Sequence, residues 1–94
     1  MTALLDLNAL PGGSLVRRGI SDLDAGRETP EALLVSIGAP RLRGIGIALP
    51  EAISDPEHKL YLLLSNDRGD AAHSAYNALV RRLVSFERAA ACAS

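Results

Sequence analysis

The sequence predicts an all-α fold, a small bundle of four to five helices that ends in a long C-terminal helix. One observation behind this prediction is an apolar seam in residues 70–92, whose members lie alternately four and three residues apart, as in a helix that packs against another helix. A second is a pair of strong helix starts, Thr29-Pro30-Glu31 and Asp55-Pro56-Glu57. The seam consists of Ala72, Tyr76, Leu79, Leu83, Phe86 and Ala90.

The chain length of 94 residues is enough for one domain. We expect residues 1–94 to form a single helical domain, in which residues 1–13 either join the core or form a loosely attached N-terminal arm. Aromatic residues make up only 3% of the chain, so the core must be built from Leu, Ile, Val and Ala. No motif in the sequence identifies a protein family.

Two helices are predicted before residue 27. The first covers residues 2–10 and ends at Pro11-Gly12-Gly13, because proline and glycine stop helices. The second covers residues 15–25, with Ser14 as its N-cap and Gly26 after its last turn. Within it, Arg18 and Asp22 lie one turn apart, and we expect them to pair on the exposed side.

The middle of the chain is predicted to hold a helix that begins at Pro30 and stops at Gly38. Pro40 then opens a short segment, residues 41–43, that leads into Gly44-Ile45-Gly46. Two glycines so close together weaken a helix by about 1 kcal/mol each relative to alanine. Residues 45–49 are therefore either helical or extended.

The next helix is predicted over residues 56–65, with Asp55 as its cap. Residues 60–64 are five apolar residues in a row, which indicates burial on more than one face and a central position in the bundle. A buried strand is the alternative, because a short apolar run has no periodicity that separates the two. Residues 66–69 form a turn, and Asp70 begins the terminal helix, which runs to Cys92.

The apolar stripe of the terminal helix is wide, because Val80 and Val84 extend it to one side. A stripe of this width predicts more than one neighbour, and in so small a chain one of them is a second subunit. The alternative is that the helix lies in a groove between two helices of its own chain. The function we expect is therefore a non-catalytic protein-interaction module whose partner is a protein or a second copy of itself. The predicted interface is Tyr76, Leu79, Val80, Leu83, Val84 and Phe86.

Basic residues also gather at two places. Arg81 and Arg88 share one face of the terminal helix, and Arg17 and Arg18 lie on the second helix. Guanidinium groups make forked contacts to carboxylates and phosphates, so these four residues form a candidate strip for an anion or an acidic partner. The alternative is a solvated charged face.

The charge balance argues against a nucleic-acid or membrane partner, because 10 basic and 11 acidic residues leave a net charge of −1. A small DNA-associated regulator or antitoxin-like protein remains an alternative function. Under this hypothesis, residues 30–46 form a helix-turn-helix whose Arg41 and Arg43 enter a groove of DNA. Arg17 and Arg18 would then lie on the same exposed face.

A small metal-dependent or acid/base enzyme is the other alternative. It would use His73, three residues after Asp70, with His58, three residues after Asp55. The chain lacks the close His-His spacing of metal sites. We therefore do not expect an enzyme, and we assign no catalytic, cofactor-binding or metal-binding residue.

The single cysteine, Cys92, excludes an internal disulfide framework and favours a reducing compartment, the cytoplasm. No apolar run approaches the roughly 20 residues that span a bilayer. Residues 1–10 are apolar but carry Asp6 and no basic residue, unlike the start of a secretory signal.

Overall fold

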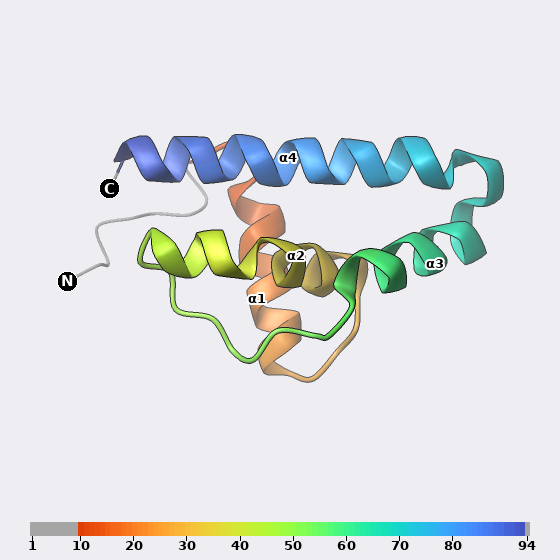
Figure 1. The fold of residues 1–94 in the computed structure, drawn as a ribbon, viewed down its shortest axis with the longest axis horizontal. Coiled ribbons are helices and arrows are strands. Elements are labelled where there is room, and N and C mark those ends of the chain that lie inside the picture. Colours follow the sequence, from red (N-terminus) through yellow and green to blue (C-terminus); the bar gives the residue numbers. More distant parts are fainter. Residues whose placement is uncertain (1–9, 94) are drawn as a thin grey trace.

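The computed structural model describes residues 10–93, so nearly all of the helix predicted over residues 2–10 lies outside the described residues. These residues form the helices α1 (Gly13–Asp24), α2 (Pro30–Gly44), α3 (Pro56–Arg68) and α4 (Ala72–Ala93), with a short 3-10 turn, η3 (Gly69–Ala71), between the last two (Figure 1). No strand occurs among them, so the predicted all-α class and the long C-terminal helix are confirmed. None of these helices combines the length and apolar character needed to cross a membrane.

The helices are arranged along α4, which forms one long edge of a molecule measuring 42 × 24 × 18 Å (Figure 1). α2 and α3 lie one after the other beside α4, and α1 crosses behind α2. α3, η3 and α4 together form a hairpin at one end. α2 packs against α1, α3 and α4 more extensively than any other helix packs against its neighbours, whereas α3 does not contact α1, so α2 is the central helix. The prediction that the helix from residue 56 is central was wrong.

The helix break predicted at Gly38 does not occur, and α2 continues through Pro40 to Gly44. Gly38 instead allows α2 and α4 to approach closely. A Cβ atom at Gly38 would lie 2.8 Å from Oε2 of Glu87 and 3.0 Å from Cδ2 of Leu83. Two segments predicted as separate are therefore one helix, so the described residues contain fewer helices than the sequence predicted for them.

The core is aliphatic apart from one aromatic ring, that of Phe86. This agrees with the expectation from composition. Its members come from all four α-helices, so each helix has one side in a common apolar interior. The largest side chains that are fully buried are Phe86, Leu33, Leu34, Leu42, Leu60, Leu83, Val16 and Val35.

The helix starts differ in how they are capped. The Thr29 hydroxyl accepts a hydrogen bond from the backbone N–H of Ala32 at 3.2 Å, as predicted for an N-cap. Ser14 is not a cap, because α1 begins one residue earlier and follows Gly12, which has a left-handed backbone. Asp55 stands at the N-cap position of α3, but its side chain makes no capping hydrogen bond.

The connection from α2 to α3 contains no strand, so residues 45–49 are not part of a sheet. Two polar side chains of α2 hold this connection. The Ser36 hydroxyl donates to the Ala32 carbonyl at 2.9 Å and accepts from the N–H of Ile53 at 3.1 Å. Arg43 donates to the Pro50 carbonyl at 2.8 Å. The connection is therefore attached to α2 at Pro50 and at Ile53.

Candidate functional site

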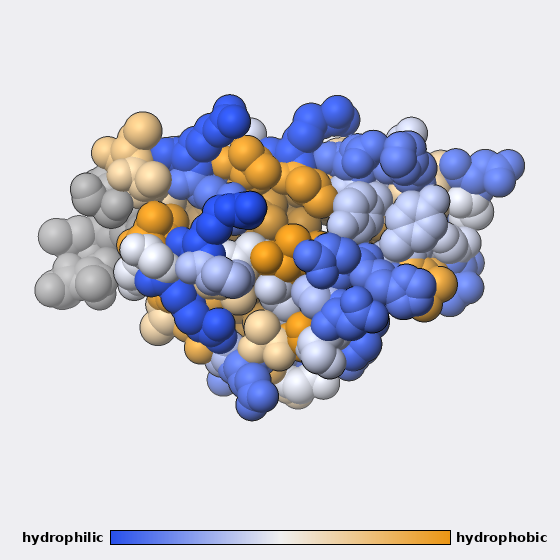
Figure 2. All heavy atoms as spheres, viewed as in Figure 1, coloured by the Kyte–Doolittle hydropathy of each residue, from blue (hydrophilic) through white to orange (hydrophobic). Residues whose placement is uncertain are grey.

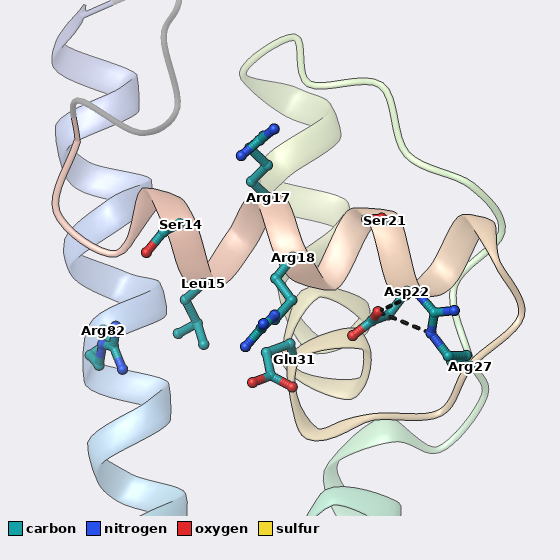
Figure 3. A pocket seen from close by; sticks show the side chains of 9 residues that line it. All are labelled: Ser14, Leu15, Arg17, Arg18, Ser21, Asp22, Arg27, Glu31 and Arg82. Carbon is teal, nitrogen blue, oxygen red and sulfur yellow. Dashed lines mark hydrogen bonds and ion pairs between the residues drawn. The ribbon is translucent and has the colours of Figure 1, made fainter.

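Two surfaces of the molecule are candidates for binding. The first is a groove between α1, the first turn of α2 and α4, and we call it the arginine groove. It has a volume of about 650 Å³ and opens to solvent (Figure 3). Its lining residues are Ser14, Leu15, Arg17, Arg18, Ser21, Asp22, Arg27, Glu31 and Arg82.

Two glycines, Gly12 just before α1 and Gly19 within it, bring the walls of this groove together. Gly12 has a φ of +73°, and a Cβ there would lie 2.8 Å from the carbonyl oxygen of Arg82. A Cβ at Gly19 would collide with the backbone of Glu31 and with the side chain of Val35. The absence of a side chain at both positions lets α1 press on α4 at one point and on α2 at another. Arg18, Glu31 and Arg82 therefore border one hollow.

One acid of the groove, Asp22, is engaged by its own chain. Its carboxylate accepts hydrogen bonds from Nε and Nη2 of Arg27, at 3.2 and 3.0 Å, and from the Thr29 hydroxyl at 2.5 Å. The hydrogen bond from Thr29, followed by the hydrogen bond and the charge of Arg27, holds the pKa of Asp22 below its usual value of 3.8, although partial desolvation opposes the shift. Asp22 thus locks the turn between α1 and α2.

The expected ion pair between Arg18 and Asp22 does not form, because Asp22 is buried and bound to Arg27 and Thr29 instead. Arg18 influences Asp22 only through its charge. Within residues 10–93, the side chains of Arg17, Arg18 and Arg82 make no hydrogen bond or ion pair. Three guanidinium groups of the groove are therefore available to a ligand.

The predicted anion-binding residues are divided between different places. Arg17 and Arg18 line the arginine groove, and Arg81 lines a neighbouring hollow together with Arg82. Arg88 is exposed on α4 and lines neither hollow. Arg82 lines both hollows and was not among the predicted residues. The available signal was its position next to Arg81 on the terminal helix.

The second candidate surface, which we call the α3–α4 surface, consists of Tyr61, Leu62 and Tyr76. Tyr61 is 41% exposed and Leu62 is 49% exposed. The rings of Tyr61 and Tyr76 have centroids 6.0 Å apart and are tilted by 58°. Burial raises the pKa of the Tyr76 hydroxyl, and the nearby Glu57 carboxylate adds to the shift. The two tyrosines thus form a partly buried pair across the hairpin.

The expectation that residues 60–64 are buried on more than one face was wrong. Leu60 and Leu64 are buried, and they lie one turn apart on the same side of α3. Leu62 is two residues from each, so it lies on the opposite side of the helix. No other helix of the described part of the chain covers that side, and Leu62 remains exposed. The spacing of Leu60 and Leu64 was the signal for this outcome.

The predicted interface on α4 is only partly at the surface. Leu83 is 1% exposed and Phe86 is fully buried, because α2 covers the first at Gly38 and the start of α1 covers the second at Gly12. These two residues cannot contact a second molecule, which corrects the prediction. The remaining residues, Tyr76, Leu79, Val80 and Val84, are half-buried. On the side of the molecule that Figure 2 draws, hydrophobic side chains gather below the middle of α4, with hydrophilic ones above them and to the right.

The helix-turn-helix predicted over residues 30–46 was wrong, because α2 is one continuous helix there. Its two arginines are also engaged within the chain. Arg41 lies 3.5 Å from the Glu87 carboxylate, and Arg43 donates to the Pro50 carbonyl. Glu87 is itself buried, with its Oε2 lacking a hydrogen-bond partner. These contacts leave no arginine pair on α2 free to enter a groove of DNA.

The histidines do not form a catalytic or metal-binding arrangement in residues 10–93. Nε2 of His73 lies 3.2 Å from Nδ2 of Asn77, and both side chains are exposed. No hydrogen bond or ion pair joins His73 to Asp70 in this part of the chain. His58 is exposed in the first turn of α3. The same residues contain no cluster of three or more His, Cys, Asp or Glu side chains placed to hold a metal ion.

Comparison of the chain with protein-family models, with curated proteins and with solved structures found no match. The functional argument therefore rests on the arginine groove and the α3–α4 surface.

Proposed function

We propose that this chain is a non-catalytic protein-interaction module that associates with a second copy of itself through the α3–α4 surface. The observation that carries the proposal is the placement of the tyrosines. The chain has three aromatic residues, and two of them, Tyr61 and Tyr76, lie together at the surface near the exposed Leu62. Tyrosine is enriched at protein interfaces, because its ring buries a large apolar area while its hydroxyl keeps a polar partner.

The packing of α3 supports a helical partner. α3 meets its own chain through Leu60 and Leu64, while Leu62 points away from that contact. Full burial of an exposed leucine contributes about 1.5–3 kcal/mol. A second hairpin laid against the first would cover Leu62 and Tyr61 in both copies. The two hairpins together would then form a four-helix arrangement, in which every helix has neighbours on two sides.

The proposal is tested by measuring the mass of the protein across a dilution series, with light scattering or analytical ultracentrifugation. We expect a dimer that dissociates on dilution, and Leu62→Ser or Tyr61→Ser variants that remain monomeric while keeping the helical circular dichroism of the parent. Tyr61→Phe retains the ring and should still dimerise. A parent chain that is monomeric up to about 1 mM, the weak end of specific affinities, would contradict the proposal.

We further propose that the association takes place in the cytoplasm. The support is Cys92, an exposed free thiol, since reduced thiols persist in a reducing compartment. Microscopy of a fluorescently tagged chain in intact cells checks this assignment independently of the oligomeric state.

A further inference from the structure

The arginine groove carries an excess of positive charge on a chain that is close to neutral overall. Four of its lining residues are arginines, Arg17, Arg18, Arg27 and Arg82, and two are acids. Asp22 is engaged by Arg27 and Thr29, as described above. The other three arginines then share the groove with a single remaining acid, Glu31. The excess is thus local to this groove, because the whole chain has a net charge of −1.

The directions of these arginines indicate the shape of the ligand. Arg17 and Arg18 leave α1 toward opposite sides, and Arg82 approaches from α4 (Figure 3). Arg18 and Arg82 therefore face the hollow from two different helices, whereas the Arg17 guanidinium points to the other side of α1. A single compact anion would meet one of the two facing guanidinium groups at a time. An extended ligand that carries several carboxylates can meet both, each through a forked, charge-assisted contact.

We propose that the arginine groove binds an acidic, extended segment of a partner protein. A nucleic acid fits less well, because no aromatic side chain lines the groove on which bases could stack. Ser14 and Ser21 border the groove and add hydroxyl groups that can bind the backbone of a peptide. The groove shares no residue with the α3–α4 surface, so acidic-segment binding and self-association are independent.

The experiment is a titration of the full chain into fluorescein-labelled octaglutamate at about 20 mM salt, followed by fluorescence anisotropy. We expect saturable binding that weakens as salt is raised, and no binding to labelled octaglutamine. Arg82→Gln and Arg18→Gln should each weaken binding about tenfold, the effect of losing one charge-assisted contact. Arg88→Gln is the matched control, because Arg88 is exposed on the same helix as Arg82 but outside the groove. It should change affinity less than about twofold.

Three outcomes would overturn the proposal. The first is no saturable binding of octaglutamate. The second is an equal loss of affinity in Arg82→Gln and Arg88→Gln, which would indicate diffuse attraction to any arginine. The third is tighter binding of a labelled thymidine octamer than of octaglutamate, which would assign the groove to nucleic acid. Circular dichroism of each variant excludes unfolding as the cause of a loss, since all three arginines are exposed.

Discussion

The α1–α2 pair and the α3–α4 hairpin both contribute to the same core, yet the helices within each pair are held together differently. α1 and α2 cross at Gly19 with their backbones close together, and a buried carboxylate, Asp22, locks the turn between them. α3 and α4 meet through larger side chains, including the tilted pair of Tyr61 and Tyr76, and leave apolar surface outside.

The difference separates a part of the molecule built for internal fit from a part that has surface left to bind. A close backbone crossing allows little adjustment, because any added atom must displace a neighbouring helix. The hairpin has no third helix over Leu62 in the described part of the chain, so changes there should alter association more than folding. Four predictions break or sharpen this comparison.

The largest effect is expected within α3 itself. Leu60→Ala should destabilise the monomer by about 2–5 kcal/mol, because it opens a cavity at a fully buried position. Leu62→Ala, two residues away, should change the free energy of unfolding of the monomer by less than about 0.5 kcal/mol. Urea denaturation at a protein concentration below the dissociation constant of the dimer measures both. Equal losses at the two positions would mean that the outer side of α3 is covered.

The crossing of α1 and α2 is the next test. Gly19→Ala should destabilise the fold by about 1–3 kcal/mol, because the added methyl group collides with the Glu31 carbonyl and with Val35. The collision outweighs the roughly 0.5–1 kcal/mol by which alanine favours a helix over glycine. Thermal or urea unfolding measures the net change.

Gly44→Ala is the matched control for this crossing. Gly44 is also helical, but an added Cβ there would meet no atom within 4 Å. The substitution should be neutral or stabilising by up to about 1 kcal/mol. A loss at Gly44 as large as that at Gly19 would show that close packing is not the reason for the effect.

A smaller loss is expected at the cap of α2. Thr29→Ala removes the hydroxyl that accepts from Ala32 and donates to Asp22, and it should cost about 1 kcal/mol. Thr29→Ser keeps the hydroxyl and should recover most of that stability. Unfolding curves of the two variants side by side provide the measurement. If serine fails to recover stability, the methyl group of Thr29 matters more than its hydrogen bonds.

The dependence of stability on pH tests the Asp22 lock. Because the pKa of Asp22 is lower in the folded chain than its usual 3.8, the unfolded chain takes up a proton first as the pH falls. The contribution of this carboxylate is therefore complete above 3.8 and is lost as the pH drops below that value toward the folded pKa. Asp22→Asn should flatten this part of the stability curve, measured from about pH 5 to about pH 2. Asp24→Asn on the same helix should leave the curve as steep as in the parent.

The sequence predicted the helical class, the start of α2 at Pro30 and the start of α3 at Pro56. It also placed Leu83 and Phe86 on the apolar seam of α4, although their contacts are with their own chain and not with a second subunit. These features could be predicted because a proline, a capping hydroxyl or a helical repeat acts within one or two turns of the chain. The seam shows which side of a helix is apolar, whereas the identity of the helix that covers it depends on distant residues.

The roles of individual residues in the candidate sites were harder to predict from the sequence. Gly38 was interpreted as a helix stop, but it is a close contact between α2 and α4. Leu62 was expected inside and lies outside, while Asp22 was expected outside and lies inside. In each case the local pattern was compatible with both outcomes, and the position of a neighbouring helix decided between them.

By itself, then, the sequence determined the helical class, the starts of α2 and α3 and the apolar side of α4, because hydrogen bonding and side-chain periodicity along a helix are local. Only the tertiary structure decided that Arg18 and Arg82 border one groove and that Tyr61 and Tyr76 meet at the surface. Those pairs join residues of different helices. Their meeting follows from how closely glycines allow helices to cross and from which sides remain uncovered once the core is filled.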